Sequence, residues 1–387
     1  MNSGSGAGVD VFNLWPTEVV PGEDLVGRAG VIGEIERELT GGRSVLLAAP
    51  RREGKSSVAR EVLRRLAEDD IYLTASLDFF RLTTKRQCAD ELVRQLLESS
   101  KTLASRLHRL LGAAGERMSG FEPHLKLAEL EFGVRLNPRE VDEDEAFRNA
   151  LQLPERLAGK EDRRVVVLLD EFQDAGKNLG QDVYRVMRSY FQEQPRTKQL
   201  FAGSHQSLLR ALFTRGNAPL LRYAVEVPLP AIQEQEWVDY IVAKFETIGV
   251  SCSRVLAAEL VRTTGGHPAD TMALCAQLTS ILREQSIEEV TADILAAAIG
   301  RTRLSLRLIF DEIWSELGST VNARLVAQRI AFGRPLSTGL KGAQASRALA
   351  VLADKGLIER VEGRWSFREP LFLVYVKDLT PRPPSWQ

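Results

Sequence analysis

One short stretch, LLAAPRREGKSSVAREVL at residues 46–63, constrains the fold more than any other part of this sequence. An apolar run stops at a proline and two arginines. Gly-Lys-Ser-Ser follows, and the next apolar residues recur at helical spacing. We therefore expect a buried strand, a tight loop and a helix, in that order. A loop of this kind points backbone N–H groups at phosphate oxygens, and the dipole of the following helix adds to the attraction.

Four more apolar runs of strand length follow along the chain, and stretches with helical spacing separate them. Three of the runs are at 71–80, 163–174 and 223–230, and the fourth opens the stretch at 197–213, which continues as a helix. Nearly continuous apolar strands that alternate with helices predict a parallel sheet covered on both faces. Residues 85–115 have helical spacing, and the alternation in LAELEFGVRLNPRE (127–140) predicts a small hairpin.

Composition is that of an ordinary globular protein, with 44% hydrophobic and 27% charged residues and a net charge of −1. No apolar run reaches the roughly 20 residues that cross a bilayer, and the first residues do not have the pattern of a signal peptide. The three cysteines and four histidines are scattered, which argues against disulfides and a zinc site. We expect a cytoplasmic protein without a membrane partner, in which nucleic acid could bind only to a local basic patch.

The loop has the residues that a nucleoside triphosphate requires. Gly54 allows close approach of the backbone, Lys55 neutralises charge on the β- and γ-phosphates, and the hydroxyl of Ser56 can ligate Mg²⁺. The glycine usual at the start of such a loop is Ala49 here. Alanine is acceptable because Pro50 already restricts this residue to extended backbone. ATP and Mg²⁺ are the expected ligands.

A second motif, VVVLLDEFQ, places two carboxylates directly after an apolar strand. Asp170 can hold the Mg²⁺ shell, and Glu171 can orient or deprotonate the attacking water. The two motifs lie on strands of one parallel sheet and in the right chain order, so together they predict a nucleotide-binding site. Asp78, at the end of the second strand, is either part of this polar shell or a turn residue.

The ordered set of motifs resembles the archaeal-type ATPase family, P-loop NTPases allied to the STAND and Orc/Cdc6 branches of AAA+ proteins. The matching pieces are LVGRAGVIGEIEREL, APRREGKSS, LLDEFQD, FAGSHQSLL, PLLR, TGGHP and SRALAVLADKGLIERVEGRWSFREPLF. The resemblance implies an α/β fold: an AAA+-like P-loop NTPase core with a parallel sheet, a helical lid and a C-terminal winged helix. The implied boundaries are an arm at 1–24, the core at 25–230 with an insertion at 85–160, the lid at 231–300 and the winged helix-turn-helix at 301–387.

The resemblance also implies roles for single residues. Ser204 stands where AAA+ relatives have a sensor of the γ-phosphate, although it could be a simple helix cap. Arg222 resembles the arginine that completes the γ-phosphate site, although a surface arginine is the alternative. His267, within TGGHP, is more in keeping with a structural than a catalytic role. The residues implied to bind nucleotide are Val26, Arg28, Pro50, Arg51, Arg52, Glu53, Gly54, Lys55, Ser56, Ser57 and Pro268.

The last 66 residues predict a module with a second ligand. From residue 322 to 378 there are ten Lys/Arg and five Asp/Glu, so this region is locally basic. In helix-turn-helix proteins the start of the recognition helix reads base edges and flanking cations hold phosphates. The candidate contacts to double-stranded DNA are Lys341, Gln344, Ser346, Arg347 and Arg364. Winged helices of STAND-like proteins also dock protein partners, and the sequence does not choose between the two.

Two functions follow. The first is a slow Mg²⁺-dependent ATPase that couples its nucleotide state to movement of the lid and winged helix, on DNA. The second is a nucleotide-gated, STAND-like switch that holds ATP or ADP and docks a protein effector with little turnover. The complete Asp-Glu pair favours the first, and both leave open whether copies of the chain assemble into an oligomer.

Overall fold

The computed structural model describes residues 14–16, 20, 22–106, 122–133, 135–136, 141–214, 216–336, 339–361 and 363–379. The chain divides into two compact units, and each is described by itself. The core unit comprises Ala29–Ala49 and Lys55–Leu229, and the C-terminal unit comprises Met1–Arg28, Pro50–Gly54 and Pro230–Gln387.

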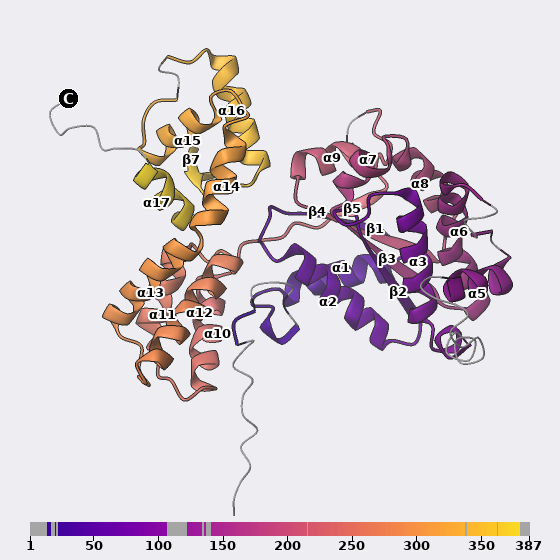
Figure 1. Ribbon diagram of the computed structural model, residues 1–387, viewed down its shortest axis with the longest axis horizontal. Coiled ribbons are helices and arrows are strands. Elements are labelled where there is room, and N and C mark those ends of the chain that lie inside the picture. The colour runs from indigo at the N-terminus through magenta and orange to yellow at the C-terminus, as the bar shows by residue number, and fades with distance from the viewer. Residues whose placement is uncertain are drawn as a thin grey trace, which may run out of the picture. The chain divides into compact units, whose positions relative to one another are not determined.

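The core unit is built on a five-stranded parallel sheet (Figure 1). Its strands are β1 (Ser44–Ala48), β2 (Tyr72–Asp78), β3 (Arg164–Asp170), β4 (Thr197–Gly203) and β5 (Ala224–Glu226). Their spatial order is β2-β3-β4-β1-β5. The register pairs Leu47 with Ala202 and Asp78 with Asp170. The carboxyl ends of β1, β2, β3 and β4 therefore meet at one edge of the sheet, which is where the candidate site residues follow in the sequence.

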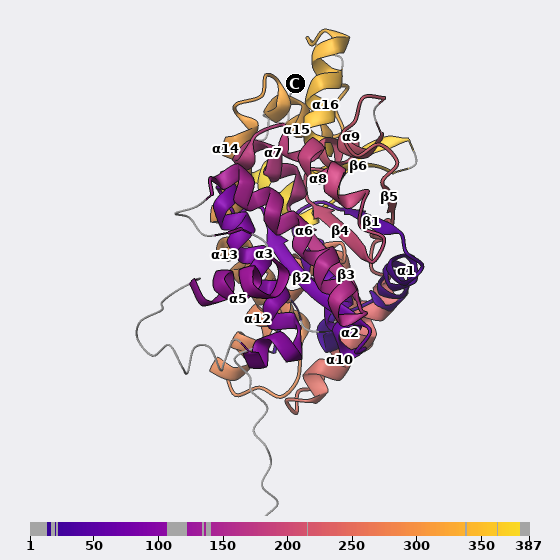
Figure 2. The same ribbon diagram turned by 90° about the vertical axis from the view of Figure 1, so that its right-hand side faces the viewer.

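Helices cover both faces of this sheet, as the apolar strands predict. One face is covered by α1 (Ala29–Thr40) and α2 (Lys55–Glu68). The other carries α3 (Lys85–Ser99), α5 (Glu122–Phe132), α6 (Glu143–Glu161), α8 (Val183–Phe191) and α9 (Gln206–Thr214). Figure 2 shows α3 and α6 packed side by side, and their apolar residues join the strands in one core. The short elements η4 (Phe172–Asp174) and α7 (Ala175–Leu179) follow β3.

The hairpin predicted over 127–140 is wrong in the part that the structure describes, because residues 127–132 form the second half of α5. Leu125 and Ala128 are buried three residues apart while Leu130 is 70% exposed, which is a helical and not an alternating pattern. The apolar residues at 127–132 are compatible with a strand or a helix, and packing against α3 favours the helix. Residues 134 and 137–140 lie outside the described residues, as do 107–115 of the stretch predicted to be helical.

The C-terminal unit begins with four helices, α10 (Glu234–Glu246), α11 (Arg254–Thr264), α12 (Pro268–Glu284) and α13 (Ala292–Ser305), which form one apolar cluster (Figure 1). Trp15 of the amino-terminal arm joins this cluster, and its indole N–H donates to the hydroxyl of Thr279 (2.7 Å). A short 3-10 helix (Gly22–Asp24) is tied to α10, because Lys244 and Tyr240 both contact the carboxylate of Asp24. The arm therefore belongs to the helical part of this unit.

The rest of this unit has the element order of a winged helix. It consists of α14 (Arg307–Leu317), α15 (Ala323–Ala331), α16 (Gly342–Asp354), the antiparallel pair β6 (Ile358–Val361) and β7 (Arg364–Phe367), and α17 (Pro370–Leu379). Phe310 and Phe372 pack together within its separate apolar cluster. The sequence analysis did not single out α17.

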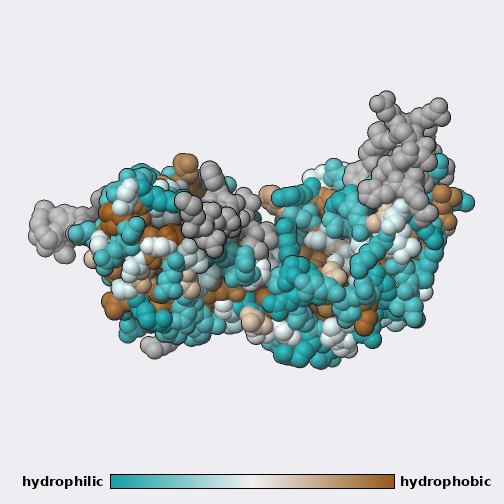
Figure 3. Space-filling model, turned by 90° about the horizontal axis from the view of Figure 1, so that it is seen from below, coloured by the Kyte–Doolittle hydropathy of each residue, from teal (hydrophilic) through white to brown (hydrophobic). Residues whose placement is uncertain are grey.

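Large exposed apolar side chains are spread over several elements, among them Phe80, Leu130, Leu208 and Leu308. The face shown in Figure 3 is accordingly mostly hydrophilic, with small separate hydrophobic areas. Within the described ranges, every helix is too short or too polar to cross a bilayer.

Candidate functional site

The loop after β1 has the backbone that a phosphate-binding turn requires. Ala49 has an ordinary negative φ and is buried, with its N–H donating to the carbonyl of Gly203 (3.3 Å), so the missing glycine is tolerated. Two residues of the loop, Arg52 (φ 67°) and Gly54 (φ 81°), have left-handed backbone. Such turns direct successive N–H groups to one side. The helix α2 begins at Lys55, so its positive end faces the same loop.

Lys55 is the centre of the site in the core unit. Its side chain is 5% exposed, and its Nζ lies 3.3 Å from Asp170 Oδ1 and 3.0 Å from Glu171 Oε1. The backbone N–H of Glu171 donates to Asp170 Oδ1 (3.0 Å). One buried ammonium is therefore shared by two neighbouring carboxylates at the end of β3.

Glu171 is the most constrained of these acids. Its Oε2 accepts hydrogen bonds from the amide of Gln173 (2.6 Å) and from the backbone N–H and hydroxyl of Ser204 (3.1 and 2.8 Å). Its backbone is left-handed, with φ 47°. Burial opposes ionisation, but Lys55, Gln173 and Ser204 outweigh it and lower the pKa of Glu171 to about 2. Glu171 is therefore a carboxylate at every physiological pH.

The sequence analysis did not assign a role to Gln173, although the residue lies within the quoted LLDEFQD motif. Besides holding Glu171, Gln173 lies against Gly203, where an added Cβ would be 2.0 Å from Gln173 Oε1. Asp78 also belongs to this edge, since it pairs with Asp170. Burial, together with Asp170 and Glu171, raises the pKa of its carboxyl group.

Arg222 is not brought to this group. It lies in the exposed loop before β5, with φ 56°, and its backbone N–H donates to the carbonyl of Phe213 (3.1 Å). Among the described contacts, none joins its guanidinium to Lys55, Asp170 or Glu171. Ser56 and Ser57 follow Lys55 in the first turn of α2.

Comparison with known proteins decides the family. Residues 24–225, more than half of the chain, match the AAA ATPase domain family. The chain belongs to the AAA ATPase domain family. It is an ATPase that binds ATP, as the paired motifs at Lys55 and Asp170 predicted.

Solved structures agree with this AAA ATPase in fold. The Walker-type ATPase PABY2304 of Pyrococcus abyssi is 18% identical with a TM-score of 0.68, and the match covers 92% of this chain and 97% of that one. The ORC2 protein of Aeropyrum pernix, solved in ADPNP–ADP complexes, is 14% identical with a TM-score of 0.61, covering 95% and 96%. The ORC1 protein of Aeropyrum pernix, solved in complex with DNA, is 16% identical with a TM-score of 0.50, covering 96% of each. No curated protein sequence matches significantly.

The remaining predicted nucleotide contacts of the AAA ATPase lie in its C-terminal unit. Arg28 is 2% exposed, and its guanidinium donates to the carbonyls of Glu53 (3.0 Å) and Pro230, so it is not a solvated arginine. Val26 packs against the apolar cluster of α10–α13. Gly27, between them, has φ 64°, and an added Cβ would be 2.6 Å from the carboxylate of Glu236. Sequence order alone did not reveal how tightly this segment is held.

Residues 50–54 of the loop also make contacts within this unit. The guanidinium of Arg52 donates to Asp270 of α12 and to Glu369 (3.2 Å), and Glu53 pairs with Arg368 (2.9 Å). Arg51 is exposed and Pro50 is buried. Pro268 is the first residue of α12, directly after His267. None of the contacts to Asp270, Arg368 and Glu369 was predicted from the sequence.

The candidate DNA contacts all lie at exposed positions, four of them at the start of α16 and one on β7. Lys341 caps α16, Gln344, Ser346 and Arg347 lie in its first two turns, and Arg364 begins β7. Between them, Ala345 and Ala348 are buried and hold the helix to its module. The exposed side of the start of α16 is therefore polar and basic.

Proposed function

We propose that this AAA ATPase hydrolyses ATP with Mg²⁺ at the group formed by Lys55, Asp170 and Glu171, and transmits its nucleotide state to a winged helix that binds double-stranded DNA. The observation that carries the catalytic part is the position of Lys55 Nζ, within 3.3 Å of both carboxylates. A phosphate-binding lysine, a metal-binding acid and a water-orienting acid at one sheet edge are the parts that ATP hydrolysis requires.

The donor atoms fit Mg²⁺, which prefers hard oxygen ligands. The hydroxyl of Ser56 and the carboxylate of Asp170 would hold the ion, and when bound it would neutralise phosphate charge. Lys55 exchanges its two carboxylates for phosphate oxygens when ATP binds. Glu171 stays ionised and accepts a hydrogen bond from the attacking water, while Ser204 and Gln173 hold its side chain in place.

Turnover is slow in this proposal. An arginine that reaches the γ-phosphate stabilises the charge of the transition state. Arg222, the candidate for this role, is exposed and lies apart from the acids. We therefore expect basal hydrolysis to be limited until the protein engages its ligand.

Steady-state phosphate release with Mg²⁺-ATP tests the catalytic roles. Glu171→Gln is expected to lower kcat about 100-fold or more while ATP still binds, because general-base assistance contributes about 10²–10⁴ in rate. Lys55→Ala is expected to lose binding and turnover together. Glu193→Gln, at an exposed position after α8, is the matched control and should retain the wild-type rate. A wild-type kcat in Glu171→Gln would contradict the assignment.

The DNA part is supported by the five exposed side chains at the start of α16 and on β7, and by the excess of basic residues in this module. The ORC1 protein that resembles this chain in fold was solved in complex with DNA. We propose that α16 lies in the major groove, as in other helix-turn-helix proteins. The helices at 231–300 and the module at 301–387 would then act as the lid and the winged helix.

Binding to duplex DNA, measured by fluorescence anisotropy at several salt concentrations, tests this part. Each phosphate-contacting cation that is removed should reduce the salt slope by about 1. Arg347→Ala and Lys341→Ala are expected to weaken binding, and Lys377→Ala, exposed at the far end of α17, is the control. The alternative is the nucleotide-gated switch with a protein partner. It replaces this proposal if the wild type binds ATP but does not hydrolyse it, does not bind DNA, and shows no hydrolysis when DNA is added.

A further inference from the structure

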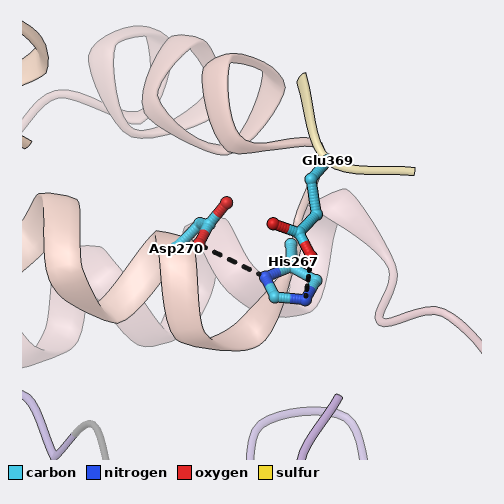
Figure 4. Close-up of side chains that lie close together, drawn as sticks. All are labelled: His267, Asp270 and Glu369. Carbon is cyan, nitrogen blue, oxygen red and sulfur yellow. Dashed lines mark ion pairs between the residues drawn. The ribbon is translucent and has the colours of Figure 1, made fainter. Parts of the chain in front are cut away.

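A histidine of the C-terminal unit lies between two buried carboxylates. His267 caps α12, Asp270 lies in the first turn of the same helix, and Glu369 precedes α17. Their exposures are 5%, 0% and 7%. Nδ1 lies 3.6 Å from Asp270 Oδ1 and Nε2 lies 3.6 Å from Glu369 Oε1. Figure 4 shows an ion pair from each of the two ring nitrogens to its own carboxylate, one on α12 and one on the segment before α17.

This arrangement fits a proton better than a metal ion. The three residues can bring one ligand atom each within 4.8 Å of the others, but the guanidinium of Arg52 already pairs with both carboxylates, and a metal ion would have to displace it. A neutral imidazole has one N–H donor, and an imidazolium has two. With His267 neutral, one of the two buried carboxylates would face a lone pair. With His267 protonated, both face an N–H.

The charges around His267 favour its protonated form. Arg52 bridges Asp270 and Glu369 from the phosphate loop. Glu53 of the same loop pairs with Arg368, and the guanidinium of Arg28 and the half-exposed carboxylate of Glu359 lie at the edge of this pair. The two carboxylates that face the ring, Asp270 and Glu369, therefore share one arginine. A proton on His267 supplies the second positive charge; without it one of these buried carboxylates lacks a counter-charge, which is costly, and burial accordingly raises the pKa of Glu369.

The cluster joins three segments that are distant in the sequence. Asp270 belongs to the helical part of the unit, Glu369 to the winged-helix part, and Arg52 to the phosphate loop. One oxygen of Asp270, Oδ2, is buried without a hydrogen-bond partner. Asp270 therefore depends on Arg52 and His267 to remain ionised in this position.

We propose that a proton on His267 closes a clasp that holds the winged-helix segment at Glu369 and the phosphate loop at Arg52 to the start of α12, and that loss of this proton opens the clasp. Burial of His267 disfavours the charged form, but Asp270, Glu369 and Glu53 outweigh it and raise its pKa. The clasp is a property of the C-terminal unit alone. Only its consequence for ATP, through the hold on Arg52, rests on the proposed function.

The sign of the pH dependence follows from the raised pKa of His267. A group whose pKa is higher in the folded than in the unfolded protein stabilises the fold below its unfolded pKa of about 6.5. That stabilisation is lost as the pH rises through the folded value. Opening is therefore expected on the alkaline side of pH 6.5.

Histidine NMR on the full chain measures the proton directly. The sequence has four histidines, so the spectrum of ¹⁵N-histidine protein is small, and His267→Gln assigns the signal by its loss. We expect His267 to titrate above pH 6.5 and therefore to be mostly imidazolium at pH 6. Glu369→Gln, which removes one facing charge, should lower that pKa. A neutral His267 at pH 6, or a pKa unchanged in Glu369→Gln, would overturn the clasp.

Thermal unfolding from pH 6 to pH 9 gives an independent readout. Wild type should lose stability relative to His267→Gln as the pH rises. His124→Gln is the matched control. Because burial lowers the pKa of His124, the wild type should not lose stability relative to His124→Gln as the pH rises. If a chelator changes the His267 signal, or added Zn²⁺ replaces the pH effect, a metal site displaces the proposal. Neither readout uses nucleotide, so failure of ATP turnover would not be mistaken for failure of the clasp.

Discussion

Replacing Lys55 by methionine should destabilise the core unit even without nucleotide, because Lys55 pairs with two carboxylates, the buried Asp170 and the partly buried Glu171. The pKa of Glu171 is about 2 against an ordinary value of 4.5. At about 1.4 kcal/mol for each tenfold change in proton affinity, this difference corresponds to about 3 kcal/mol in total. Lys55 shares it with the hydrogen bonds from Gln173 and Ser204, so we expect Lys55→Met to cost about 2 kcal/mol at pH 7.

The pH dependence of this loss is a stricter test than its size. A carboxylate with a lowered pKa stabilises the fold above about pH 4.5 and loses that contribution as the pH falls toward 2. In Lys55→Met the pKa of Glu171 rises, since burial is no longer opposed by the ammonium. The difference in the free energy of unfolding between Lys55→Met and wild type should therefore be constant near neutral pH. It should become smaller below about pH 5.

Chemical denaturation and thermal melting measure both effects. A loss of about 2 kcal/mol lowers the Tm of a unit of this size by roughly 4–8 °C. The double variant Lys55→Met with Glu171→Gln removes one of the two carboxylates that Lys55→Met leaves without their ammonium, so it should recover part of the stability. Lys126→Met, at an exposed lysine of α5, is the control. If Lys55→Met is as stable as wild type at pH 8, or the double variant recovers nothing, the buried-charge reasoning is refuted.

Three other substitutions probe local packing, two of them behind the acids of the core unit and one on α13 of the C-terminal unit. Gly203→Ala places a Cβ 2.0 Å from Gln173 Oε1, so it should displace that amide from the catalytic acid, cost about 1–3 kcal/mol and lower turnover, as melting curves and phosphate release would show. Gly300→Ala, in an exposed helical position with open space around it, should instead stabilise by about 0.8 kcal/mol in denaturant titrations. Tyr184→Phe removes the hydroxyl that accepts from the buried N–H of Gly176 (2.9 Å), and a loss of about 1–3 kcal/mol is expected; an unchanged denaturation midpoint would contradict that role.

The sheet and the acids of the core could be predicted because their signals are local. The central residues of β1 and β3 are buried on both faces, so they form continuous apolar runs, and the motif residues follow at the ends of these runs. The hairpin prediction failed where the signal was ambiguous, since the period of residues 122–132 is settled by contact with α3. A short amphipathic stretch does not specify its own partner.

The contacts of Arg52 could not be predicted. Its partners are 218 and 317 residues away, and no spacing or motif relates a loop arginine to an acid on a distant helix. The same holds for Gln173, which was visible within a motif but whose role depends on the neighbouring strand. Long-range electrostatic partners become visible only when the chain is folded.

The strand order has a consequence for folding during synthesis on the ribosome. Both neighbours of β1 come late, because β4 ends at Gly203 and β5 at Glu226, whereas β1 ends at Ala48. At about 5–20 residues per second, on the order of ten seconds or more pass before β1 can be paired. During that time the apolar β1 has no strand partner and would be a target for a chaperone. A nascent chain arrested before residue 197 should therefore not retain ATP, however complete its phosphate loop is.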